Sequence, residues 1–86
     1  MSETPETRLK RLRLRSWRRG TREMDLVLGQ YADEALAGLD ETGLDAFEAL
    51  LDEADPDLYE WVSGAAAPPP AHGTTIARIR AFHRLG

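Results

Sequence analysis

The chain has 86 residues and no cysteine, which limits it to one small domain and excludes disulfide bonds, thiolate metal sites and thiol catalysis. Its net charge of −4 at pH 7 argues against general affinity for nucleic acid. No apolar run approaches the roughly 20 residues that span a bilayer, and the acidic N-terminus lacks the apolar region of a secretory signal, so we expect a cytoplasmic protein without membrane insertion.

The first helix is predicted to begin at Pro5, because proline is favoured in a first turn, and to end at Arg19, whose charge suits a helix C-terminus. Gly20 then fits the left-handed position that ends many helices. The inward stripe of this helix consists of Leu9, Leu12 and Ser16, with Trp17 beside it.

The second helix is predicted to follow directly. Thr21 is its candidate N-cap, and Glu23 and Asp25 lie in its first turn, where the helix dipole favours negative charge. The third helix is predicted to open at Asp40. Gly43 inside it costs about 1 kcal/mol relative to alanine, so its first turn is expected to be loose.

The fourth helix is predicted from Asp55 as N-cap and Pro56 as first helical residue, and it should end near residues 63–64. Residues 65–73 contain three consecutive prolines and are predicted to form a linker of polyproline character. The fifth helix is predicted to begin near residues 74–75.

Helical periodicity throughout, without alternating β-type runs, predicts an all-α fold, a compact five-helix bundle. We expect a single domain over residues 1–86, in which residues 1–6 are flexible and the longest irregular segment is 65–73. The predicted core contains Leu9, Leu12, Val27, Leu28, Tyr31, Phe47, Leu50, Leu51, Leu58, Trp61, Val62, Ile76 and Ile79.

Residues that could carry catalysis are few. His72 falls in the predicted linker and His83 near the C-terminus, and neither has the spacing of a metal site or of a nucleophile. No glycine-rich phosphate loop is present. We therefore predict no enzyme activity, no metal and no stably bound cofactor. We interpret the nearby carboxylates as a solvated acidic face, formed by Asp52, Glu53, Asp55 and Asp57.

Charge is segregated along the sequence. Eight of the eleven basic residues lie between Arg8 and Arg22, whereas the stretch from Asp25 to Glu60 has twelve acidic residues and no basic one. Like charges on one surface repel each other, so this segregation favours surfaces that meet a partner. We predict a basic face from the first helix and an acidic face from the third and fourth.

The junction of the first two helices carries Arg19-Gly20-x-x-Glu23 and has two interpretations. In the structural one, Gly20 ends a helix, Glu23 complements the start of the next, and Arg19 contacts Glu23. In the other, the helix break displays Arg19 and Glu23 on an exposed corner beside Trp17, as a docking surface. An arginine fork and a carboxylate side by side can each bind one charged group of a partner.

Three motifs follow one another along the chain. They are Arg18-Arg19-Gly20-Thr21-Arg22-Glu23-Met24-Asp25-Leu26, then Leu39-Asp40 with Phe47-Glu48-Ala49-Leu50-Leu51-Asp52, and Asp55-Pro56-Asp57-Leu58-Tyr59-Glu60-Trp61-Val62. In this order and spacing they resemble the SdhE-type FAD assembly factors of succinate dehydrogenase, from about Leu9 to Ile79. Thr21 departs from the apolar residue often found after the glycine in that family.

The resemblance implies a small helical protein that binds the flavoprotein subunit of succinate dehydrogenase, and in some bacteria that of fumarate reductase. It implies that the protein promotes covalent attachment of FAD to a histidine of that client, without catalysis or a cofactor of its own. We expect a monomer with no nucleic-acid partner. The expected partner-binding residues are Arg19, Gly20 and Glu23 of the signature, with Trp17, Arg18, Arg22 and Asp25 around them.

The alternative hypothesis is a small regulatory or antitoxin-like module that binds a protein or nucleic acid through its arginine-rich first helix. Two short helices around Gly20 could mimic a helix-turn-helix, with the Arg8–Arg22 run on phosphates. The acidic middle of the chain would repel a duplex unless it faced away from it.

Overall fold

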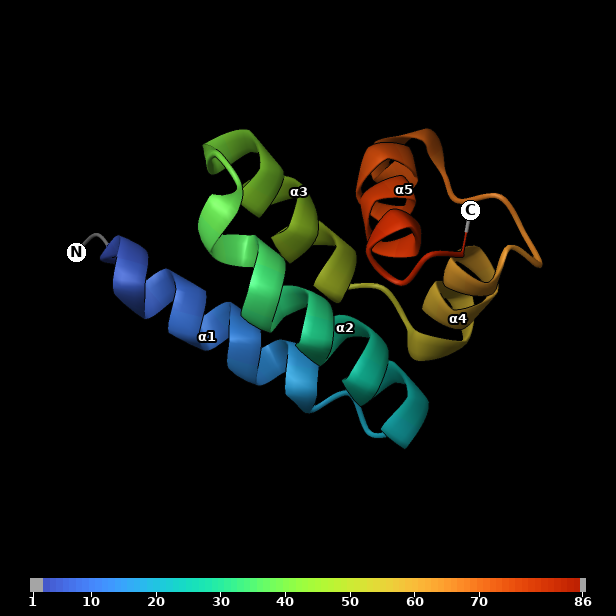
Figure 1. Ribbon diagram of the computed structural model, residues 1–86, viewed down its shortest axis with the longest axis horizontal. Coiled ribbons are helices and arrows are strands. Elements are labelled where there is room, and N and C mark those ends of the chain that lie inside the picture. Colours follow the sequence, from blue (N-terminus) through green and yellow to red (C-terminus); the bar gives the residue numbers. More distant parts are fainter. Residues whose placement is uncertain (1–2, 86) are drawn as a thin grey trace. The chain divides into compact units, whose positions relative to one another are not determined.

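The computed structural model describes residues 3–85 (Figure 1). Within these residues every regular element is a helix and no strand occurs, so the predicted all-α fold with five α-helices is confirmed. None of the helices in this described part of the chain is both long and apolar enough to cross a membrane. The elements are α1 (Pro5–Trp17), α2 (Arg22–Ala35), η1 (Leu36–Gly38), α3 (Glu41–Leu51), α4 (Asp55–Ser63), η2 (Pro70–His72) and α5 (Gly73–Phe82), where η denotes a short 3-10 helix.

The helices group into two compact units. The first extends to Leu39 and contains α1, α2 and η1, and the second begins at Asp40 and contains α3, α4, η2 and α5. In the first unit α1 and α2 pair as a helical hairpin (Figure 1), and in the second α5 packs against both α3 and α4. The organisation of residues 1–86 as a single domain stays a prediction. The flexibility of residues 1–6 also stays a prediction, and residues 1 and 2 lie outside the described part of the chain.

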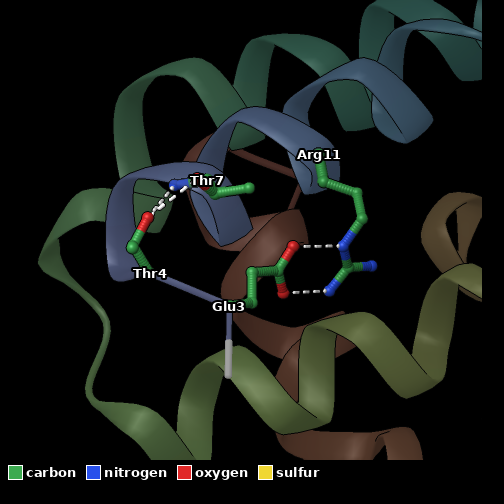
Figure 2. A network of polar contacts seen from close by, with 4 residues as sticks. All are labelled: Glu3, Thr4, Thr7 and Arg11. Atoms are coloured by element: carbon green, nitrogen blue, oxygen red, sulfur yellow. Dashed lines mark hydrogen bonds and ion pairs between the residues drawn. The ribbon is translucent and has the colours of Figure 1, made fainter. Parts of the chain in front are cut away.

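A capping network defines the start of α1 (Figure 2). Thr4 is the N-cap, and its hydroxyl accepts the backbone N–H of Thr7 at 3.1 Å. Glu3 forms a bidentate ion pair with Arg11, with nitrogen–oxygen distances of 2.8 and 2.9 Å. The proline predicted for the first turn is the first helical residue. One of the arginines of α1 is thus already paired with a carboxylate of the same chain.

The α1–α2 hairpin buries small and apolar side chains from both helices. Ser16 is fully buried in α1, and its hydroxyl donates a hydrogen bond of 2.7 Å to the carbonyl of Leu12, one turn earlier. In α2 the buried positions recur every three or four residues, as expected of an amphipathic helix. The buried residues of α2 and η1 are Met24, Leu28, Gly29, Tyr31, Ala32 and Leu36.

The second unit combines a helix cap, an arginine clamp and an apolar core. Asp40 caps α3 by accepting the N–H of Gly43 at 2.8 Å, so the turn expected to be loose is fixed by a hydrogen bond. Arg80 of α5 donates to the carbonyl of Val62 in α4 and, at 2.6 Å, to that of Leu85. The buried apolar core of this unit consists of Phe47, Leu50, Leu51, Leu58, Val62, Ile76 and Ile79.

Two predicted helix boundaries differ slightly from the structure. α1 ends at Trp17 rather than at Arg19, because the backbone leaves helical geometry at the next residue. α4 has Ala54 as its N-cap, so Asp55 is the first helical residue and not the cap. Pro56 is tolerated one position later than predicted because the first four N–H groups of a helix have no partner within it.

The proline-rich segment is more ordered than predicted. Residues 70–72 form η2 and α5 begins at Gly73, so the prediction of a polyproline-like linker over 65–73 was wrong for its last four residues. Residues 64–69 are still the longest irregular segment of the described chain.

His72 lies in this segment, but its side chain is buried. Its Nε2 lies 2.7 Å from Oε2 of Glu53, and its ring centroid lies 5.7 Å from that of Trp61. The histidine therefore ties η2 to the loop that follows α3. Glu53 consequently departs from the solvated acidic face to which the sequence assigned it.

The predicted core is confirmed except at three positions. Leu9, Val27 and Trp61 are half-buried. Leu9 lies toward the open end of the hairpin and Val27 at the edge of the α2 stripe, while an indole is so large that it is rarely covered completely. Buried residues that the predicted core omitted are Met24, Ala32 and Leu36, and the polar Ser16, His72 and Thr75.

Candidate partner-binding site

The turn between α1 and α2 holds the Arg-Gly-x-x-Glu signature. The turn begins at Arg18, whose backbone N–H still donates to the carbonyl of Arg15 at 3.3 Å. Gly20 has a φ of +104°, the left-handed conformation predicted for it, which costs other residues about 1–2 kcal/mol. Thr21 then begins α2 as the predicted N-cap, and its hydroxyl accepts the N–H of Met24 at 3.3 Å.

Asp25 fixes this turn from the α2 side. Its carboxylate accepts the backbone N–H of Arg19 at 2.6 Å, and its own N–H donates to the carbonyl of Thr21 at 3.0 Å. Asp25 is half-buried, so it faces the turn more than the solvent. The role that the geometry supports for Asp25 is to hold the backbone of the arginine in place. Its direct contact with a partner stays a prediction.

The other signature side chains form an open corner. Arg18, Gly20, Arg22 and Glu23 are exposed, and Arg19 is half-buried. A Cβ atom added at Gly20 would meet no heavy atom within 4 Å, so the space above the turn is free. The glycine is therefore required by its backbone conformation and not by crowding within the chain. A side chain at position 20 would project outward from the turn and would keep the surface of another molecule at a distance from the backbone.

Trp17 is held against α2 by two residues that the sequence analysis did not single out. Its indole N–H donates to the carboxylate of Asp33 at 3.1 Å. Gly29 lies beneath the ring, because a Cβ atom there would lie only 2.2, 2.4 and 2.7 Å from Cδ2, Cε2 and Cε3 of the indole. Trp17 is half-buried, and it links α1 to α2 as well as bordering the predicted corner.

Gly29 and Asp33 were missed because their role depends on a residue of another helix. They lie one turn apart on α2, and Trp17 reaches both from the end of α1. The available signal was a glycine in a helix interior, which costs about 1 kcal/mol relative to alanine and therefore often marks a close approach.

The corner can bind charged groups but carries no catalytic arrangement. Within residues 3–85 no group of three or more His, Asp and Glu side chains is placed to hold a metal ion. The pockets of about 360 and 280 Å³ in the second unit are lined by none of the signature residues. The exposed charged side chains of Arg18, Arg22 and Glu23 fit the surface of another protein better than an enclosed small molecule.

The sequence profile of the protein family described as "Flavinator of succinate dehydrogenase" matches residues 10–83, which include the whole corner. The chain belongs to this family. The resemblance to FAD assembly factors read from the three sequence motifs is therefore confirmed.

Several relatives of the flavinator family are similar to this chain. The FAD assembly factor SdhE of Methylococcus capsulatus is 42% identical over 68 residues, which cover 78% of this chain and 82% of that protein. The FAD assembly factor SdhE of Coxiella burnetii is 34% identical over 61 residues, covering 71% and 74%. The mitochondrial succinate dehydrogenase assembly factor 2 of Mycosarcoma maydis is 43% identical over 86 residues, covering 98% of this chain.

The mitochondrial relatives are longer proteins. This chain spans 36% of the length of the relative from Mycosarcoma maydis, 45% of that from Meyerozyma guilliermondii and 37% of that from Arabidopsis thaliana.

Proposed function

We propose that this protein is an assembly factor that binds the flavoprotein subunit of succinate dehydrogenase and promotes covalent attachment of FAD to it. Membership of the flavinator family and the names of its relatives support this function. The observation that carries it is the corner itself: Gly20 in a left-handed turn, with free space above it, between Arg19 and Glu23.

The corner would act as a two-charge docking point. The guanidinium of Arg19 presents parallel N–H donors to a carboxylate of the client, and the carboxylate of Glu23 accepts from a basic or N–H group. Asp25 keeps the backbone of Arg19 in place before binding, so that less conformational entropy is lost on docking. The bare Gly20 lets the client surface approach the turn closely.

Binding would help flavin attachment by selecting one arrangement of the client. The reaction requires FAD, the acceptor histidine and nearby charges to lie in a reactive geometry. A protein that binds only this arrangement raises its population, and it needs neither a catalytic group nor a stably bound FAD of its own. We therefore propose an assembly factor that is not an enzyme and acts as a monomer in the cytoplasm, with fumarate reductase as a second client.

Flavin fluorescence of the denatured client tests this function. The flavoprotein subunit from cells with and without this protein is separated on a denaturing gel, where only covalently attached flavin stays with the protein band and makes it fluorescent. We expect strong fluorescence with the protein and little without it. Equal covalent flavin in both strains would contradict the proposal.

Glu23→Ala tests the corner within the same assay. We expect the variant to remain folded and to lose covalent flavin in the client. Glu34→Ala is the matched control, since Glu34 is another exposed glutamate of α2 but lies at its far end. A folded Glu23→Ala protein that supports normal flavin attachment would overturn the docking role of the corner.

The alternative, a regulatory or antitoxin-like module, rests on the basic residues of α1. That helix carries five basic residues and one acidic residue, and α3 and α4 together carry six acidic residues and no basic one. Arg11 is paired with Glu3 and is therefore less available to phosphates. A pull-down separates the hypotheses, because it recovers either a flavoprotein subunit or nucleic acid.

A further inference from the structure

Large apolar side chains that remain exposed are few, and two of them lie on the hairpin. In the described chain they are Leu14 and Leu26, which are 51% and 38% exposed, and Tyr59 and Leu85 of the second unit. Single exposed apolar residues are normal on protein surfaces, whereas a cluster of them marks an interaction site. The first question is therefore whether Leu14 and Leu26 lie together.

Helix geometry places both leucines beside Trp17. Successive residues of an α-helix are rotated by about 100°, so Leu14 and Trp17, three residues apart, lie about 60° apart on α1. Leu26 and Asp33, seven residues apart, lie within about 20° on α2. Because the Trp17 indole reaches across to Asp33 and to Gly29, it extends over the face of α2 that also carries Leu26. These helix rotations place the three side chains on one face of the hairpin, which is called the apolar patch below.

The centre of this patch is held by contacts within the hairpin itself. The Trp17 ring is fixed by its hydrogen bond to Asp33 and by its close approach to the backbone at Gly29. An aromatic side chain that is already ordered loses little conformational entropy on binding, and tryptophan is among the residues most enriched at the energetic centres of interfaces.

The patch is continuous with the charged corner. Leu14 lies four residues before Arg18, which follows the end of α1, and Leu26 lies one turn after Arg22 and Glu23 on α2. All three charged residues are exposed. An apolar centre bordered by charged side chains is the usual composition of a protein–protein interface.

We propose that Leu14, Trp17 and Leu26 form the apolar centre of the surface that docks the client, and that they bind an apolar segment of its flavoprotein subunit beside the groups held by the corner. This inference rests on the proposed function. The patch is assigned to the client because it adjoins the corner at which the client is proposed to dock.

Binding to the purified apo-flavoprotein subunit with FAD present tests the inference by calorimetry. Leu14→Ala combined with Leu26→Ala should raise Kd about tenfold or more, because truncation removes apolar contacts at the interface centre. Leu85→Ala is the matched control, as Leu85 is also an exposed leucine, 48% exposed, in the other unit. It should change Kd by less than about twofold. Melting curves check that all variants remain folded.

The outcomes separate the two proposals. If the wild-type chain binds the subunit and the double variant binds it equally well, the apolar patch is refuted and the proposed function stands. If the wild-type chain does not bind the subunit at all, both are refuted. Sedimentation of the chain alone gives the remaining outcome: a dimer that the double variant abolishes would assign the patch to self-association and refute the client as its occupant.

Discussion

Replacing Gly29 by alanine should destabilise the hairpin, although the same change stabilises most helix interiors by about 1 kcal/mol. The new Cβ atom would lie 2.2 Å from Cδ2 of Trp17, whereas carbon atoms in contact lie about 3.5–4.0 Å apart. The indole would therefore have to withdraw by more than about 1 Å, and its hydrogen bond to Asp33 would be lost or lengthened.

These effects can be compared on one scale. Overpacking typically costs about 1–3 kcal/mol, and a lost hydrogen bond between side chains costs about 0.5–1.5 kcal/mol. Subtracting the propensity gain of about 1 kcal/mol leaves a net destabilisation of about 2 kcal/mol. In a chain of this size that corresponds to a fall in Tm of about 10 °C.

Urea unfolding followed by circular dichroism measures the change in free energy. Trp17 fluorescence, recorded in a Trp61→Phe background, should shift to longer wavelength in Gly29→Ala because the displaced indole meets more water. Gly38→Ala is the control, since a Cβ atom there would meet no heavy atom within 4 Å, and it should leave stability unchanged or slightly raised. A Gly29→Ala protein as stable as this control would refute the close-approach argument.

The remaining predictions concern the core, the corner and the charges. Phe47→Ala should lower the free energy of unfolding by about 3–5 kcal/mol because Phe47 is fully buried, enough to unfold much of the population; a wild-type urea midpoint would contradict this. Glu23→Ala should cost a few tenths of a kcal/mol up to about 1 kcal/mol, the value of a first-turn carboxylate, and a loss above about 2 kcal/mol would indicate a structural role. Binding to the flavoprotein subunit should weaken as salt rises; an affinity that is equal at low and high salt would show that the charged surfaces are incidental.

Local rules explain which features could be predicted from the sequence. Thr21 was identified as an N-cap and Asp40 as the start of a helix, because a capping side chain bonds to residues only two or three positions away. The left-handed turn at Gly20 follows from the absence of a Cβ atom, which is also a property of a single residue. The one-residue shift at the start of α4 reflects how weakly proline distinguishes the first positions of a helix.

The partner-binding role of the candidate site stays a prediction. The signature was located by motif, and the structure places Arg18, Arg22 and Glu23 in the open, as a docking surface requires. The sequence did not reveal that Asp25 fixes the turn through the backbone of Arg19. An acidic residue in the first turn of a helix is equally consistent with a favourable helix dipole alone, so its spacing could not distinguish the two roles.

The sequence by itself determined the helices, the N-cap of α2 and most of the side chains that the helices bury, because these depend on neighbours within a turn of the chain. The tertiary structure alone decided the contacts between distant residues. Trp17 meets Gly29 and Asp33, and His72 meets Glu53, across 12 to 19 positions of sequence. Such pairs leave no periodic pattern, because their partners are set by how the helices pack and not by the spacing along any one of them.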